Sequence, residues 1–335
     1  MDLNTLWFVL VTVLFAGYFI LEGFDYGVGM LLPFLGRGDR ERRMILNSIG
    51  TFWDGNEVWL LTAGGAIFAA FPNWYATMFS GFYLPLFLIL LGLIVRAVGF
   101  EFRSKDRHPA WRATWDWMVA VGSLLPALLF GVAVGNLLCG VPIDAHMTYV
   151  GGFWNLLNPF ALVTGVTFVL LFLLHGALFL TLRTSGPVLA RAQAAARGLW
   201  LPTVVAAVVL LAYSFFRTGM FKGGIAGWIL GAAAAVTLLL TGVLARARPG
   251  TAFAMTALTI LLVTVAAFRA MFPNVMISTL NPDWSLTIYN ASSSPYTLRI
   301  MTFVAVTMVP IVLCYQGWTY WVFRKRLTAE TTMEY

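Results

Sequence analysis

Residues 3–30 read LNTLWFVLVTVLFAGYFILEGFDYGVGM, and this stretch decides the class of the fold. Its first part, residues 3–21, contains no Asp, Glu, Lys or Arg and is close to the roughly 20 residues that a helix needs to cross a bilayer. Two carboxylates, Glu22 and Asp25, follow among glycines. A charged side chain at the centre of a bilayer costs about 2.5–3.5 kcal/mol on insertion scales. We therefore expect both carboxylates to face protein or water, which makes them candidates for function.

The rest of the chain is equally apolar. Its 335 residues are 60% hydrophobic and only 10% charged, whereas soluble domains carry about 25% charged residues. Further runs without charged residues cover 58–95, 117–143, 145–182, 198–216, 223–245, 249–268 and 300–323. The run 58–95 is too long for one span and contains a turn signal at Phe71-Pro72, so it predicts two helices. The prediction is an all-α integral membrane protein, a single membrane domain over residues 1–335 with nine transmembrane helices.

Basic residues gather in alternate connections between these helices. The connections after the first, third, fifth, seventh and ninth helices carry most of them: Arg37, Arg40, Arg42, Arg43, Arg103, Lys105, Arg107, Arg112, Arg183, Arg191, Arg197, Arg246, Arg248, Arg324, Lys325 and Arg326. The opposite side has only Arg217, Lys222 and Arg299. Because basic loops stay in the cytoplasm, the N-terminus is predicted outside and the C-terminus inside, with a short cytoplasmic tail from about residue 325. The net charge of +7 then reflects topology, and no nucleic-acid partner is predicted.

A second acidic group, WDGNEVW at residues 53–59, begins the next helix and contains Asp54 and Glu57. Each acidic pair is spaced i, i+3, so its two members lie on one face of a helix. Buried carboxylates can exchange protons near neutral pH, and the two faces therefore predict a route for protons or cations.

Simpler roles compete with a proton route. Asp54 could complement the dipole at the start of its helix, and Glu57 could pair with Arg96 on the following helix. A solvated surface is the simpler interpretation for three residues near the cytoplasmic ends of the next helices: Glu101, Lys105 and Asp116.

Histidine usage argues against a haem held by this chain. The chain has three histidines, of which His108 and His146 fall in predicted loops and only His175 lies within a predicted helix. Two axial histidines cannot be supplied from these positions. We expect no haem iron and no metal site in this chain, and we expect His175 to be a packed or hydrogen-bonded residue.

Several long motifs carry a resemblance to a known family. They are EGFDYGVGM at 22–30, the segment 42–49, WDGNEVWLLTAGGA at 53–66, RAVGF at 96–100, FRSK at 102–105, GVAVGN at 131–136, STLN at 278–281 and Tyr320-Trp321. Together they resemble subunit II of cytochrome bd-type quinol oxidases, and the resemblance covers essentially the whole chain. Motifs of this length are far more specific than a single short pattern.

The resemblance implies a partner and an activity for the complex. Subunit II pairs with a haem-bearing subunit I, which holds haem b and haem d, and the complex oxidises quinol and reduces O2 to water. It lies in the cytoplasmic membrane of bacteria or archaea. No catalytic residue and no independent activity are then expected for this chain. The resemblance leaves open an additional small single-helix subunit and an isoprenoid quinone bound by this chain.

The resemblance also implies roles for individual residues. Asp25 and Asp54 match acids proposed to lead protons toward the oxygen-reducing haem, and Glu101 and Lys105 match positions near the cytoplasmic entrance. Arg96 matches an arginine near the subunit boundary and is a candidate partner of haem propionates. Glu22 and Glu57 join the candidates by spacing alone. The alternative is a proton-coupled transporter, although the later helices contain no second copy of the acidic pair.

Overall fold

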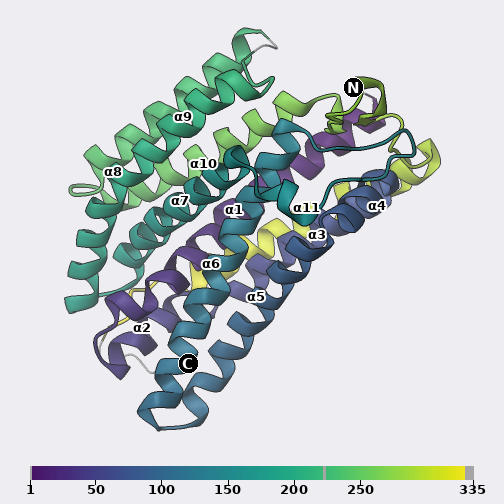
Figure 1. Cartoon of the computed structure of the whole chain (residues 1–335). Helices are drawn as coiled ribbons and strands as arrows, with labels where there is room; N and C mark the ends of the chain where they lie inside the picture. Colours follow the sequence, from purple (N-terminus) through teal and green to yellow (C-terminus); the bar gives the residue numbers. More distant parts are fainter. Residues whose placement is uncertain (1, 222–223, 329–335) are drawn as a thin grey trace.

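The computed structural model describes residues 2–221 and 224–328, and within them the fold is a bundle of long helices (Figure 1). The α-helices are α1 Leu3–Leu35, α2 Asp39–Gly50, α3 Trp53–Ala70, α4 Pro72–Gly81, α5 Tyr83–Phe102, α6 Pro109–Cys139, α7 Pro159–Arg183, α8 Gly186–Arg217, α9 Ile225–Leu244, α10 Pro249–Met271 and α11 Pro295–Val322. The short elements are the 3-10 helices Arg103–Lys105, Phe153–Leu157 and Pro282–Trp284, with two antiparallel strands, β1 Asn274–Met276 and β2 Leu286–Thr287. The all-α prediction is confirmed.

Eight helices in the described part of the chain are long and apolar enough to cross a membrane: α1, α5, α6, α7, α8, α9, α10 and α11. The ninth predicted span corresponds to α3, whose 18 residues extend about 27 Å at 1.5 Å per residue. It is not among the eight, and it contains both Asp54 and Glu57. The count of nine and the orientation of the termini stay predictions.

Helix α1 lies at the centre of the bundle and packs against α3, α6, α7 and α10. Figure 1 shows α8 and α9 at one side of it and α4 and α5 at the other. The contact with α7 depends on glycine, because a Cβ on Gly27 would lie 1.9 Å from the carbonyl oxygen of Phe172. A Cβ on Gly176 would in turn lie 2.5 Å from the backbone of Gly27. The two backbones therefore touch, in the way that small residues allow in membrane helices.

Two ends of the bundle are distinct. At one end the N-terminus meets the loop before α11, where Asn4 Nδ2 donates to the carbonyl of Ile288 at 2.7 Å. At the other end the chain after α11 returns to α7, because Leu327 N donates to the carbonyl of Arg183 at 2.8 Å and Ser185 Oγ donates to Leu327 O at 2.9 Å. The predicted tail from about residue 325 is described only to residue 328, and Lys222 also lies outside the described residues.

Two helices were not predicted. The arginine-rich connection after α1 contains α2, whose apolar residues Met44, Ile45, Leu46 and Ile49 are buried against the bundle. The predicted break at Phe71-Pro72 is confirmed, but α4 follows it as a separate ten-residue helix before α5 begins at Tyr83. Pro72 stands at the first turn of α4, where the missing amide hydrogen costs nothing.

Candidate functional site

The two carboxylates of α1 are fully buried, each with 0% exposure, and they reach different neighbours. Glu22 forms an ion pair with Arg96 of α5. The same guanidinium donates through Nη2 to Glu57 Oε1 of α3 at 2.8 Å. Glu22, Arg96 and Glu57 therefore join α1, α5 and α3 in one ion cluster, and the predicted pairing of Glu57 with Arg96 is confirmed.

This ion cluster is tightly enclosed on the Arg96 side and more open at Glu57. The side chain of Arg96 has 0% exposure, whereas that of Glu57 has 21%. The guanidinium lies 4.9 Å from the ring centroid of Tyr26, whose hydroxyl is hydrogen-bonded to that of Tyr18. Nε and Nη1 of Arg96 have no hydrogen-bond partner within the described residues. Buried polar groups normally find such partners, so this site has capacity for water or for a rearranged carboxylate.

Asp25 is held by an amide instead of a cation. Asn56 Nδ2 of α3 donates to Asp25 Oδ2 at 2.7 Å, and both residues have 0% exposure. Asn56 Oδ1 in turn accepts from Tyr320 at 2.9 Å and from Gln316 at 3.2 Å, both on α11. Asp25 Oδ1 has no hydrogen-bond partner within the described residues. The two oxygens of the buried Asp25 therefore differ, since within the described residues only Oδ2 is held by a hydrogen bond.

The remaining predicted residues lie at the surface of the chain. Asp54 is exposed, and its Oδ1 accepts from the backbone amide of Gly55 at 2.7 Å. Glu101 and Lys105 are exposed at the end of α5 and in the short helix after it. The structure therefore brings Glu22, Asp25 and Glu57 close to Arg96 or Asn56, and it does not join the other three to them. The role of Asp54 in leading protons toward the haem, and that of Glu101 and Lys105 near the cytoplasmic entrance, stay predictions.

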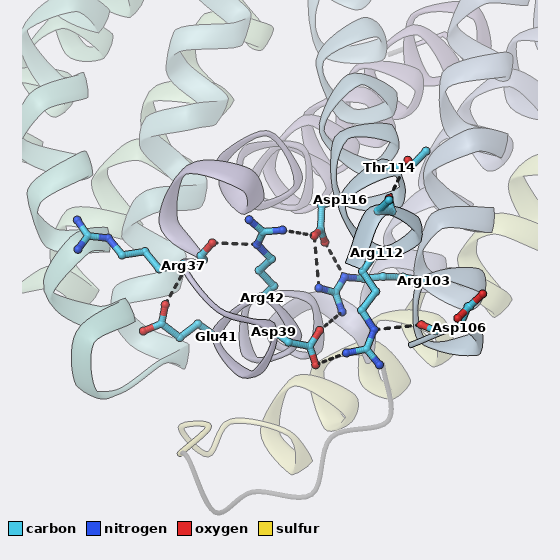
Figure 2. Close-up of polar contacts among 11 residues, drawn as sticks. Arg37, Asp39, Glu41, Arg42, Arg103, Asp106, Arg112, Thr114 and Asp116 are labelled. Carbon is cyan, nitrogen blue, oxygen red and sulfur yellow. Dashed lines mark hydrogen bonds and ion pairs between the residues drawn. The ribbon is translucent and has the colours of Figure 1, made fainter. Parts of the chain in front are cut away.

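A separate network of charges joins the ends of α2, α5 and α6 (Figure 2). Asp116, with 1% exposure, accepts from Arg42 Nη1 at 2.7 Å and from Arg103 Nε at 2.6 Å. Asp39 of α2 bridges Arg103 and Arg112 at 3.0 and 2.8 Å. The interpretation of Asp116 as a solvated surface residue was wrong, because its arginine partners come from two other segments of the chain. This network fixes α2 against the bundle.

His175 does not fit a haem. Its Nε2 donates to the carbonyl of Ile20 at 3.2 Å, its Nδ1 lies 2.6 Å from Thr256 Oγ1, and its ring stacks on Phe253. Both nitrogens are thus engaged, as expected for a packed, hydrogen-bonded histidine. The described ranges 2–221 and 224–328 contain no group of three or more His, Cys, Asp or Glu side chains that could hold a metal ion.

An apolar cavity of about 660 Å³ lies about one helical turn from the ion cluster and opens to the surface, where Phe68 and Phe87 are 60% and 48% exposed. Its lining comes from α1, α3, α4, α5, α6 and α10, and includes Phe19, Gly64, Phe87 and Phe130. Trp74 of α4 also lines it, with 1% exposure and with no hydrogen-bond partner for its Nε1 within the described residues. A cavity of this size and character can take an elongated apolar molecule that carries a hydrogen-bond acceptor.

Sequence reasoning missed the residues around Asp25. Asn56 lies inside the acidic motif, but its role depends on α11, more than 250 positions later in the sequence. Gln316 could have indicated a polar contact of this helix. It is the one amide side chain within the charge-free run 300–323, and such a group needs a hydrogen-bond partner in a membrane.

Comparison with known proteins gives the family. A family model described as cytochrome bd terminal oxidase subunit II matches residues 3–323. The chain belongs to this family. A relative from Bacillus subtilis (strain 168), named cytochrome bd ubiquinol oxidase subunit 2, is 45% identical over 100% of this chain and 99% of its own length. Another from Escherichia coli (strain K12), named cytochrome bd-I ubiquinol oxidase subunit 2, is 42% identical over 98% of this chain and 96% of its own length.

A solved structure has the same fold. A chain of the bd oxidase from Geobacillus thermodenitrificans superposes with a TM-score of 0.75 and covers 97% of this chain and 100% of its own length. Its sequence identity is 18%, so this likeness concerns the fold alone. The resemblance found in the motifs is confirmed, and the chain is a multi-pass membrane protein of a respiratory oxidase family.

Proposed function

We propose that this chain is the haem-free subunit of a bacterial quinol oxidase, that its complex reduces O2 to water, and that the chain supplies a proton path from the cytoplasm. The observation that carries the proposal is the pair of fully buried carboxylates, Glu22 and Asp25, on the central helix of a subunit II family member. Reduction of oxygen consumes protons, and buried acids are suited to relay them. The activity belongs to the complex, and this chain has no catalytic centre of its own.

The two subunits would have different tasks in this reaction. Haem b and haem d, held by the partner subunit I, supply electron transfer and oxygen binding. The residues of this chain then only have to move protons, and the ion cluster provides a start, because Glu57 is partly exposed and shares Arg96 with the buried Glu22. Asp25 lies one helical turn from Glu22. Since Arg96 is committed to two carboxylates inside this chain, a role within the path is favoured over contact with a haem propionate.

The exposed face of α3 is the surface we assign to subunit I. Asp54, Gly55 and Gly65 are exposed there, and a Cβ added at either glycine would meet nothing within 4 Å. A charged residue at membrane depth is costly against lipid, and exposed glycines allow another helix to approach closely. A helix of subunit I packed on this face would shield Asp54 from lipid and could approach closely at the glycines. The small single-helix subunit stays a prediction, and we assign no surface of this chain to it.

The apolar cavity near the ion cluster is the candidate site for an isoprenoid quinone. Its walls suit an isoprenoid tail, and Trp74 lies against it with a buried Nε1 that has no hydrogen-bond partner within the described residues and could donate to a quinone carbonyl. Organic extraction of the purified complex should release quinone beyond the amount that exchanges with added quinol. Trp74→Phe should lower that tightly held fraction, and an unchanged fraction would remove Trp74 from the site.

The test of the proton path uses the purified two-subunit complex. We expect Asp25→Asn and Asp54→Asn to slow quinol-driven oxygen uptake strongly while the haem spectrum stays near that of the wild type. Thr307→Val is the matched control, because the hydroxyl of Thr307 only donates to the carbonyl of Phe303 on the exposed side of α11. Loss of haem together with uptake would make the mutated acid structural. An unchanged rate in both acid variants would refute the path.

The transporter alternative makes the opposite prediction. A tagged chain purified in mild detergent should bring a second large subunit with b- and d-type haem absorbance if it belongs to an oxidase. A colourless chain without a partner would favour a proton-coupled transporter. Family membership favours the oxidase.

A further inference from the structure

A continuous series of hydrogen bonds leads from an indole on α3 through α11 to Asp25. Trp59 Nε1 donates to Gln316 Oε1 at 2.8 Å, and Gln316 Nε2 donates to Asn56 Oδ1 at 3.2 Å. Asn56 Nδ2 then donates to Asp25 Oδ2 at 2.7 Å. The series crosses between α3 and α11 twice before it ends on α1, so it depends on the docking of α11.

The chemistry of its first member fixes the direction of the whole series. An indole N–H can only donate. Gln316 must therefore present its carbonyl oxygen to Trp59, which turns its amide nitrogen toward Asn56. Asn56 must then present its own carbonyl oxygen to Gln316, and its amide nitrogen is left to face Asp25.

Tyr320 reinforces the same orientation from a second position on α11. Its hydroxyl donates to Asn56 Oδ1 at 2.9 Å, so that oxygen accepts two hydrogen bonds. The ring of Tyr320 stacks on Phe52 with centroids 4.4 Å apart and planes 2° apart, which limits the positions that the hydroxyl can take. A flip of the Asn56 amide would turn its nitrogen toward the amide nitrogen of Gln316 and its oxygen toward Asp25, so the bonds to Gln316 and Asp25 would break together.

We propose that Trp59, Gln316, Tyr320 and Asn56 are positioning residues that assign separate tasks to the two oxygens of Asp25. Oδ2 is held as a permanent acceptor by Asn56, and Oδ1 is the atom that takes up and releases the proton. Asp25 Oδ1 is buried and has no hydrogen-bond partner within the described residues. In each uptake a hydronium ion gives a proton to Oδ1 and becomes water as an O–H bond forms. In each release that O–H bond breaks as the next water accepts the proton and becomes hydronium, with no change in oxidation state.

This inference rests on the proposed proton path and adds a role for α11. Leu298 is the only fully buried residue of α11, and most of the helix is exposed, so polar links such as those of Gln316 and Tyr320 contribute to its attachment. Because two residues of α11 orient the amide at Asp25, a shift of this helix would disturb the relay without a change at the carboxylate itself. Proton transfer in this chain is therefore sensitive to whatever packs against α11.

The experiment compares two isosteric variants in the purified complex. Asn56→Asp keeps an acceptor for Tyr320 and Gln316 but replaces the fixed amide donor to Asp25 with an ionisable carboxyl group. Gln316→Glu keeps the acceptor for Trp59 but removes the donor to Asn56, and it is a milder change because Gln316 is only half-buried. Hydrogen bonds to charged groups are strong, so we expect kcat for oxygen uptake to fall by about tenfold or more in Asn56→Asp and by less in Gln316→Glu.

Three further readouts separate positioning from simple damage. KM for quinol and the haem content should stay near the wild-type values, and the solvent deuterium isotope effect on kcat should increase. In infrared difference spectra, the carboxyl band that disappears in Asp25→Asn should shift in both isosteric variants. Thr307→Val, on the same helix but outside the series, should change none of these quantities.

The outcomes distinguish this inference from the proposed function. If Asp25→Asn takes up oxygen at the wild-type rate, the path and the inference both fail. If Asp25→Asn is slow but Asn56→Asp and Gln316→Glu keep the wild-type kcat, isotope effect and carboxyl band, the inference alone fails. Should Asn56→Asp not assemble, the carboxyl band of Gln316→Glu decides, and an unshifted band overturns the inference.

Discussion

Replacement of Arg96 by methionine tests whether the ion cluster holds the bundle together. The variant keeps a long side chain in the same space but leaves Glu22, with 0% exposure, without its cation. Glu57 also loses its partner, although it keeps some contact with the surface. Removal of one member of a buried ion pair costs about 3–5 kcal/mol, because the remaining charge stays desolvated. We expect a loss of that size in the free energy of unfolding.

The assay is unfolding of the purified complex by titration with a denaturing detergent, followed by tryptophan fluorescence and haem absorbance. Arg40→Met is the matched control, since Arg40 is exposed and such surface changes usually stay within about 0.5 kcal/mol. A triple variant that combines Arg96→Met with Glu22→Leu and Glu57→Gln removes the unpaired charges. It should recover most of the stability that the single variant loses, because apolar replacement of a buried ion pair is often neutral.

Two results would refute this reasoning. Arg96→Met could unfold at the same detergent concentration as Arg40→Met, which would mean that the ion pairs contribute nothing to stability. The triple variant could instead be no more stable than Arg96→Met alone. In that case the loss would come from packing around the guanidinium, such as its contact with the ring of Tyr26, and not from charge.

Two further predictions concern packing and pH. Gly27→Ala should lower the free energy of unfolding by about 1–3 kcal/mol or more and lower the yield of folded complex, because the new Cβ would lie 1.9 Å from the carbonyl oxygen of Phe172. Gly198→Ala is the control and should change neither quantity, since its Cβ would meet nothing within 4 Å. The hydrogen bond from Arg191 lowers the pKa of Glu41 from its ordinary 4.5, so the ionised carboxylate stabilises the fold above about pH 4.5 and that contribution is lost as pH falls through the lowered pKa. Thermal unfolding measured against pH should therefore fall less steeply below 4.5 in Glu41→Gln, and equal slopes would contradict the assignment.

Much of the fold follows from charge-free runs and local signals. Runs of about 20 residues without charge marked the apolar helices, and Phe71-Pro72 marked a real break. Ser294-Pro295 is another local signal and marks the start of α11. Ser294 Oγ caps this helix by accepting a hydrogen bond from Thr297 N. Helix α2 was not predicted because the segment 37–43 contains four arginines and was interpreted as a loop. The burial of its apolar residues depends on contacts with other helices.

The site was only partly predictable, for a geometric reason. The i, i+3 spacing correctly placed Glu22 and Asp25 near one another on α1. A shift of three residues still turns a side chain by about 60° around the helix, and in a crowded bundle that is enough to change its neighbour. Glu22 therefore meets Arg96 of α5, while Asp25 meets Asn56 of α3. Spacing within one helix cannot reveal which residue of another helix will stand opposite.

Charge balance connects this geometry to the proposed function. Within the described residues, Arg96 pairs with Glu22 and Glu57, and the nearby buried Asp25 has no cation as its hydrogen-bond partner. In a medium of low dielectric constant one guanidinium balances one carboxylate charge, and neighbouring like charges repel strongly. The remaining charge must be balanced by bound protons or by a cation outside this chain. Under the proposed function, an electron that arrives at a haem in subunit I would change this balance and favour the uptake of a proton. In the proposed function, a cluster with fewer cations than acids would couple electron arrival to proton entry, whereas a fully paired cluster would not respond.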